Sequence, residues 1–260
     1  MTTVSDILNF MNTIAPPNRQ EKWDRAGLNC GHLNAAVTKI LVALDPFMES
    51  CREAKAFGAE LLVTHHTLLW DGGFITDRDP VGANALFLIE NGIAHINAHT
   101  SLDLANGGVN DALAAKLGLS NVQIVEPMTD GGESYGLLRM GTVEEQSLES
   151  FLGHVKNALN CDGLRYVNCG KPVRRVAVCG GSGMGELAAV VAAGCDTYVT
   201  GDVKYNSFRE AYDAGINVID AGHFHTENPV VAVLAEKMSA AFPEIQVKIS
   251  QTNWDRMKFY

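Results

Sequence analysis

Histidine and acidic side chains gather at three places in the sequence. His65 and His66 follow the apolar run Leu-Leu-Val-Thr, His99 stands four residues before Asp103, and the segment His223 to Glu227 carries two imidazoles and a carboxylate. Imidazole nitrogen and carboxylate oxygen together form the ligand set of first-row metals such as Zn, Mn, Fe and Ni. The sequence therefore predicts a divalent-metal site. Paired metals of this kind activate water for hydrolysis.

Each of these segments follows a predicted strand. The strands are expected over 61–64, 94–98 and 217–221, where short apolar runs stand between turn residues. Ligand sites of open parallel sheets lie at the carboxyl ends of the strands. Because neighbouring residues of a regular strand point to opposite faces, His65 and His66 are expected to serve two ions and not one. Asn228 and Pro229 are typical of a helix start, so 223–227 is expected to be a loop.

The chain repeats itself, and the repeat supplies the elements that position these residues. Residues 37–43 align with 173–179, and 58–66 align with 194–202 at the same offset. Residues 92–98 align with 215–221 at a shorter offset, which predicts extra residues in the first copy, in the loop from Asp71 to Pro80.

Each copy alternates apolar strands with helices, and this alternation predicts an α/β fold. We expect two similar three-layer units with mostly parallel sheets flanked by helices. The boundary is expected between residues 127 and 128, which gives units over 1–127 and 128–260, and interleaving of their elements stays open. Asp103 and Glu227 follow equivalent strands of the two copies and are the natural bridging carboxylates between two metals.

Composition excludes several classes of protein. The 260 residues are 47% hydrophobic and 19% charged, which is typical of a globular chain. The sequence contains no apolar stretch of the roughly 20 residues that span a bilayer. A net charge of −10 makes nucleic acid an unlikely partner. The N-terminal residues do not resemble a secretory signal, and the six cysteines stand singly, so we expect a cytoplasmic protein with reduced thiols.

A glycine-rich turn and a lysine are candidates for substrate contact. Gly181 and Ser182 lie in the run 179–186 between a predicted strand and helix, where backbone N–H groups can bind an anion. Lys204 is a second candidate for a substrate phosphate. A plain turn and a solvated loop are the alternatives for these two segments. The turn lacks the G-x-G-x-x-G spacing, which argues against a dinucleotide-dependent oxidoreductase.

Taken together, six motifs resemble one known family. They are Trp23-Asp24-Arg25-Ala26-Gly27-Leu28, Val63 to His66, Ala98 to Asp103, Val178 to Gly183, Thr200-Gly201-Asp202, and Gly222-His223 with Glu227. Over essentially its whole length the chain resembles the Nif-three-like dinuclear metal-centre hexameric proteins, also labelled GTP cyclohydrolase I type-two homologues.

The resemblance implies two divalent metal ions per chain, of identity Zn, Fe, Mn or Ni. It implies that their ligands are His65, His66, Asp103, His223 and Glu227, with Glu227 shared between the ions. It also implies a homohexamer, a toroidal trimer of dimers. The sequence departs from the family at Asn206, where many members carry histidine, and at His225, an extra imidazole that is not counted among the ligands.

These observations favour a metal-dependent hydrolase that acts on a small phosphorylated or nucleotide-like substrate. His99 or Asp45 is the candidate for handling protons. The alternative is a non-catalytic metal-binding oligomer with a regulatory or scaffold function, and the sequence leaves both open.

Overall fold

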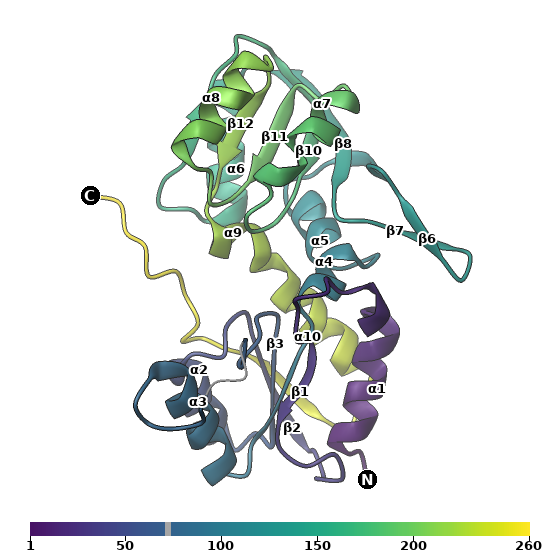
Figure 1. Cartoon of the computed structure of the whole chain (residues 1–260), viewed down its shortest axis with the longest axis vertical. Helices are drawn as coiled ribbons and strands as arrows, with labels where there is room; N and C mark the ends of the chain where they lie inside the picture. The colour runs from purple at the N-terminus through teal and green to yellow at the C-terminus, as the bar shows by residue number, and fades with distance from the viewer. Residues whose placement is uncertain (71–73) are drawn as a thin grey trace. The chain divides into compact units, whose positions relative to one another are not determined.

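The computed structural model describes residues 1–70 and 74–260, and the chain divides into two compact units (Figure 1). Unit 1 comprises 1–102 and 231–254, and unit 2 comprises 103–230 and 255–260. The predicted α/β class is confirmed. The division differs from the expected boundary at 127/128, because segments of each half of the sequence pair with strands of the other half. Asp71, Gly72 and Gly73 of the expected insertion lie outside the described residues.

Unit 1 is built on a five-stranded sheet of order β1-β4-β3-β2-β13. Its strands are β1 (Gly27–Cys30), β2 (Lys39–Ala43), β3 (Leu61–Thr64), β4 (Ala94–Asn97) and β13 (Gln246–Ile249). All neighbours are parallel except β1, which runs antiparallel to β4 at the edge. β3 and β4 are buried along their whole length, and the near-continuous apolar sequence of β3 is typical of such a strand.

Helices cover this sheet. Cys51 and Ala54 of α2 (Met48–Phe57) and Leu88 of α3 (Pro80–Glu90) pack with Leu41 and Leu62 of the sheet. In Figure 1, α1 (Val4–Ile14) lies on the other side of the sheet from α2 and α3.

The first helix shows how its sequence fixes its start and its buried face. A capping box between Thr3 and Asp6 starts α1. The helical spacing of Val4, Ile7 and Met11 then gives it one buried face.

Unit 2 is built on a six-stranded sheet of order β5-β8-β10-β11-β12-β9. Its strands are β5 (Ser120–Ile124), β8 (Arg139–Gln146), β9 (Arg165–Val167), β10 (Val173–Val178), β11 (Thr197–Thr200) and β12 (Asn217–Asp220). Only β10, β11 and β12 pair in parallel, and β5, β8 and β9 add antiparallel neighbours. This sheet is therefore mixed, whereas the sequence predicted mostly parallel sheets.

The three layers of unit 2 follow from the alternation of side chains along its strands. Val178 and Val199 pack on one face with α5 (Val109–Lys116) and α6 (Leu148–Leu159). Tyr198 and Val218 pack on the other face with α7 (Leu187–Ala192) and α8 (Tyr205–Asp213). The remaining elements are the 3-10 turns η1 (Pro17–Arg19) and η2 (Met184–Glu186), the hairpin β6 (Met128–Asp130) and β7 (Glu133–Tyr135), and α4 (Thr100–Leu104), α9 (His223–Glu227) and α10 (Pro229–Ala241).

The two repeats exchange their last strands. β5, which ends the first repeat, pairs with β8 in the sheet of unit 2, and β13, which ends the second repeat, pairs with β2 in the sheet of unit 1. α4 and α10 carry the chain across the division between the units.

Glycines with positive φ stand at the ends of helices in both units. Gly58, Gly92, Gly194 and Gly215 all have φ between 68° and 74°, a conformation that ends a helix and favours glycine. Among the described residues, no helix has both the length and the apolar character that a membrane crossing requires.

Candidate metal centre

Three imidazoles meet at the carboxyl end of the sheet in unit 1. His65, His66 and His99 each offer a ring nitrogen, and these nitrogens all lie within 4.8 Å of one another. The expectation that His65 and His66 point to opposite faces is wrong. Their strand ends at Thr64, and the Thr64 hydroxyl donates to the His66 carbonyl at 2.6 Å, so the chain has left the regular strand before the two rings.

The imidazoles of His65 and His66 are each held through Nδ1. His65 Nδ1 lies 3.0 Å from the Ala98 carbonyl oxygen, and His66 Nδ1 lies 2.6 Å from Asp45 Oδ1. A carbonyl and a carboxylate only accept, so Nδ1 carries the proton in both rings. Nε2 is then the nitrogen with the lone pair that a metal ligand needs. Asp45, a candidate for proton handling, thus lies against a predicted ligand and orients it.

His99 is held by a carboxylate that the sequence reasoning did not single out as a site residue. Its Nδ1 donates to Asp24 Oδ1 at 3.1 Å, and Asp24 Oδ2 accepts from the Thr100 N–H at 2.9 Å. Burial raises the pKa of Asp24, but the hydrogen bonds from His99 and Thr100 outweigh burial and bring this pKa to about 2. Asp24 is therefore ionised near neutral pH and fixes His99 with its proton on Nδ1.

In unit 2, His223 and Glu227 lie one helical turn apart. His223 Nε2 is 3.1 Å from Glu227 Oε2, and both residues belong to α9. The expected loop over 223–227 is wrong. Asn228 does not cap a new helix but keeps helical angles (φ −55°, ψ −27°), and its N–H donates to the Phe224 carbonyl at 2.8 Å. Pro229 follows without strain because the first turn of a helix needs no N–H there.

Glu227 also lies close to Asp103. A carboxylate oxygen of each lies within 4.8 Å of the other. His223 Nδ1 is 2.7 Å from Asp202 Oδ2, the same Nδ1-to-carboxylate arrangement that holds His66 in unit 1. Within unit 2, Glu227 therefore lies close to both Asp103 and His223.

The glycine-rich turn packs directly against this group. A Cβ on Gly181 would lie 2.3 Å from Glu227 Oε1, and the backbone there has φ of 62°. The N–H groups of Gly180, Gly181 and Gly183 donate to the side chains of Asn110, Thr226 and Thr200. These three N–H groups are thus engaged within unit 2, and Gly181 serves to make room for the carboxylate. Ser182 and Lys204 are exposed.

Two further predictions concern His225 and Asn206. His225 Nδ1 lies 3.2 Å from the Leu159 carbonyl, and its Nε2 lies 3.4 Å from Asp255 Oδ2. Both ring nitrogens therefore face acceptors of the protein, which agrees with leaving His225 out of the ligand set. Asn206 lies in the first turn of α8.

The donor chemistry fits a divalent transition metal. Metal-binding histidines commonly donate their second ring N–H to a carboxylate or a backbone carbonyl, and His65, His66 and His223 all do so. The Gly181 backbone leaves space beside the Glu227 carboxylate that a side chain would fill.

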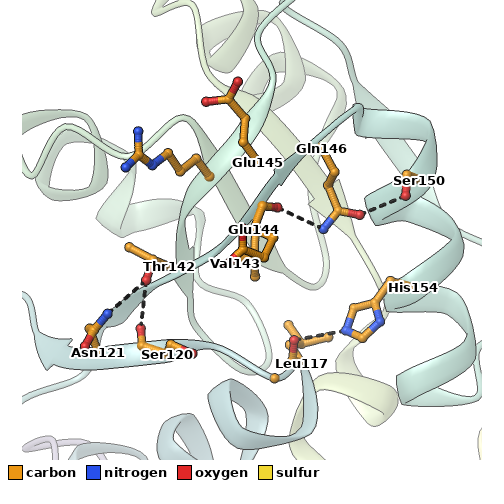
Figure 2. A pocket seen from close by; sticks show the side chains of 12 residues that line it. Leu117, Ser120, Asn121, Thr142, Val143, Glu144, Glu145, Gln146, Ser150 and His154 are labelled. Carbon is orange, nitrogen blue, oxygen red and sulfur yellow. Dashed lines mark hydrogen bonds between the residues drawn. The ribbon is translucent and has the colours of Figure 1, made fainter.

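A polar groove of about 950 Å³ lies elsewhere in unit 2 (Figure 2). It is lined by β5, β8 and α6, with hydrogen bonds from Asn121 to Thr142 and from Ser150 to Gln146. Asp103, His223 and Glu227 are not among its lining residues. This groove is separate from the candidate ligands of its own unit.

The fold and these groups define an α/β protein whose two sheets carry imidazole and carboxylate side chains at their strand ends. The model of the Duf34/NIF3 family (NGG1p interacting factor 3) matches residues 2–256. The chain belongs to the Duf34/NIF3 family, which confirms the resemblance seen in the sequence.

Curated relatives and solved structures agree. The GTP cyclohydrolase 1 type 2 homolog of Clostridium perfringens (strain 13 / Type A) is 32% identical over 260 residues, covering 98% of this chain and 99% of the relative. The Bacillus cereus protein related to NIF3 has a TM-score of 0.94 at 24% identity, covering 100% of this chain and 99% of its own, and shows the same fold. Reduced HcgD from Methanocaldococcus jannaschii has a TM-score of 0.80 at 28% identity, and the match covers 96% of this chain and 98% of HcgD.

Proposed function

We propose that this chain binds two divalent metal ions and hydrolyses a small phosphorylated or nucleotide-like substrate. The proposed ligands are His65, His66, Asp103, His223 and Glu227, with Glu227 shared between the ions. The observation that carries the proposal is the fixed orientation of the histidines. His65, His66 and His223 each donate through Nδ1 to a carbonyl or carboxylate, so Nε2 is the ring nitrogen with the lone pair that a metal ligand needs.

When bound, the metals would lower the pKa of water and polarise the bond to be cleaved. The chain's own residues supply the remaining functions. Asp24 holds the proton of His99 on Nδ1, so that the other ring nitrogen can take a proton from the attacking water. In phosphoester hydrolysis, water forms the new P–O bond, the bond to the leaving oxygen breaks, and that oxygen takes up a proton. Lys204 is the proposed contact for the phosphate.

A hydrolysis screen of metal-loaded protein tests the catalytic part of the proposal. Phosphomonoesters, phosphodiesters and nucleotides are offered with Zn, Mn, Fe or Ni, and with a chelator. We expect turnover that chelation abolishes and that His99→Ala lowers by about 10² to 10⁴-fold. His32→Ala, at an exposed histidine of the same unit, is the control and should retain full turnover. Protein that holds metal but turns over none of these substrates would instead support the non-catalytic metal-binding oligomer.

We also propose that the chain forms a cytoplasmic homohexamer. The state of the cysteines supports a reducing compartment: all six are free, and burial raises the pKa of the Cys51 thiol to about 12, so this thiol is unreactive. Light scattering coupled to size-exclusion chromatography measures the assembly. A mass six times that of the chain is expected, and a stable monomer would contradict it.

A further inference from the structure

Two exposed tryptophans lie beside the imidazole group of unit 1. Trp23 and Trp70 have ring centroids 6.2 Å apart and ring planes 23° apart, so the indoles stack. Trp23 is 59% exposed and Trp70 is 40% exposed. Leaving two large apolar rings in water costs free energy that burial would recover. We call this pair the aromatic shelf.

The His99 ring contacts both indoles of the aromatic shelf. The Trp70 and His99 rings meet edge to face, with centroids 4.9 Å apart and planes at 89°, and the Trp23 and His99 centroids are 5.7 Å apart. His99 is itself fixed by the buried carboxylate of Asp24, the residue next to Trp23. The indoles are thus anchored to a buried hydrogen-bonded pair, and a ligand would lose little entropy in ordering them.

We propose that the aromatic shelf binds the planar ring of a nucleobase by stacking and so presents the rest of a nucleotide to the His65, His66 and His99 group. A nucleotide is then the substrate class of the proposed function. The inference rests on that function only in taking the neighbouring imidazole group as the reactive site. Stacked aromatic rings have centroids about 4.5 to 7 Å apart, so the two indoles already touch and leave no gap for a third ring. The base therefore stacks on an outer face of the pair, and Trp23 offers the more exposed ring.

The size of the aromatic shelf fits a base better than a protein partner. An aromatic side chain buries about 150 to 250 Å² in full, so the exposed parts of the two indoles together give at most about 250 Å². A stable protein interface needs about 800 Å² on each partner. A single base covers one indole face and gains stacking energy whatever its identity, which makes the shelf tolerant of the base and selective for a ring.

Tryptophan fluorescence measures this binding directly. The chain has three tryptophans, and Trp254→Phe leaves only the two of the shelf. Adenosine 5′-monophosphate and ribose 5-phosphate are titrated into this variant, both after chelation and after metal loading. We expect the nucleotide to quench the emission and to bind about tenfold more tightly than the sugar phosphate, the size expected for one stacked base.

Substitutions then assign the binding to the shelf. In the natural chain, calorimetry should show that Trp23→Ala or Trp70→Ala weakens the nucleotide about tenfold and leaves ribose 5-phosphate unchanged, with Trp23→Phe recovering most of the affinity. Trp254→Ala, at another exposed tryptophan of unit 1, is the matched control and should not alter either affinity. Circular dichroism verifies that each variant is folded.

Three results would overturn the inference. They are equal affinity for the two ligands, equal nucleotide affinity in parent and Trp23→Ala, or a change of assembly size in Trp23→Ala, which would make the shelf a contact between copies of the chain. Metal content is measured on the same samples. It distinguishes a shelf that does not bind the nucleobase from a chain that does not bind metal. A metal-loaded, hydrolytically active protein with unchanged nucleotide affinity in Trp23→Ala refutes the shelf alone. A metal-free chain whose shelf still binds the nucleotide refutes the metal proposal alone.

Discussion

At the scale of single residues, the candidate centre depends on the groups that orient the histidines. His66 and His223 each donate a hydrogen bond from Nδ1 to an aspartate, and His65 donates one to a backbone carbonyl. A carboxylate that accepts from Nδ1 raises the basicity of Nε2 and fixes the ring, so residues that touch no metal still set metal affinity.

Asp45→Asn tests this orientation. The amide replaces the charge that His66 Nδ1 faces at 2.6 Å, so we expect metal affinity to fall by about 10 to 100-fold while the fold is retained. Competition with a chromogenic chelator measures the affinity. Asp77→Asn, at an exposed aspartate of unit 1, is the control. Equal affinities in Asp45→Asn and the parent would show that Asp45 does not support the ligand.

Gly181→Ala tests the space beside Glu227. The added Cβ would lie 2.3 Å from the carboxylate oxygen at a backbone φ of 62°, so the carboxylate or the turn must shift. We expect a loss of stability of about 1 to 3 kcal/mol and a lower metal content. Gly185→Ala is the matched control from the same turn, because its Cβ would meet nothing within 4 Å. Metal content and urea unfolding are measured on both variants, and identical behaviour of the two would contradict this reading.

At the scale of elements, Glu53 of α2 ties the chain after β13 to unit 1. Its carboxylate accepts from the Ser250 hydroxyl at 2.7 Å and from the Thr252 N–H at 3.1 Å, and it pairs with Lys248 Nζ at 2.9 Å. Burial raises the pKa of Glu53, but these hydrogen bonds outweigh burial and lower the pKa to about 2. The ionised form is therefore stabilised in the folded state.

This lowered pKa makes the stability depend on pH. The contribution of Glu53 to the free energy of unfolding is present above the unfolded pKa of about 4.3. This contribution is lost as the pH falls through about 2. We expect Glu53→Gln to lower the free energy of unfolding by about 3 kcal/mol at pH 7, with the difference from the parent shrinking between pH 4.5 and 2. Urea unfolding across this range measures it, with Glu90→Gln at an exposed glutamate as control. A difference that does not change with pH would rule out the linkage.

Elements with strong local signals were predictable from the sequence. The apolar run gave β3 with its observed bounds, and the strands predicted over 94–98 and 217–221 are β4 and β12, each one residue shorter. The prediction of a loop over 223–227 was wrong because Asn-Pro as a helix-start signal depends only on neighbouring residues. The hydrogen bond from the Asn228 N–H to the Phe224 carbonyl continues the helical turn instead. β5 is exposed along most of its length and carries no apolar run, so its place beside β8 had no signal in the sequence.

The candidate segments were predictable from the sequence, and their contacts were not. Strand ends marked residues 65–66, 99–103 and 223–227. The family resemblance then implied His65, His66, Asp103, His223 and Glu227 as the ligands. The partners that orient the rings lie far away in sequence: 75 residues separate His99 from Asp24, and 21 separate His66 from Asp45. No local pattern links such pairs, so only the folded chain reveals them.

At the scale of the whole molecule, the last strand of each repeat pairs in the sheet of the other unit. β2 pairs with β13, and β8 pairs with β5, so neither half of the sequence holds all the strands of one sheet. A half on its own would expose an unpaired strand edge.

Separate fragments 1–127 and 128–260 test this exchange. We expect neither fragment to fold cooperatively alone, because each lacks a strand of its sheet, and we expect mixing to restore cooperative unfolding. Circular dichroism and thermal unfolding of the fragments and of the mixture measure it. Two fragments that fold independently would contradict the strand exchange.

We propose that the chain binds two divalent metal ions and that His65, His66, Asp103, His223 and Glu227 are their ligands. It is tested most directly by elemental analysis of protein purified without an affinity tag or added metal, beside His66→Ala and Glu227→Ala. We expect about two divalent ions per chain in the parent and fewer in both variants. A parent protein that stays metal-free after incubation with Zn, Mn or Fe, or variants that keep the metal content of the parent, would contradict it.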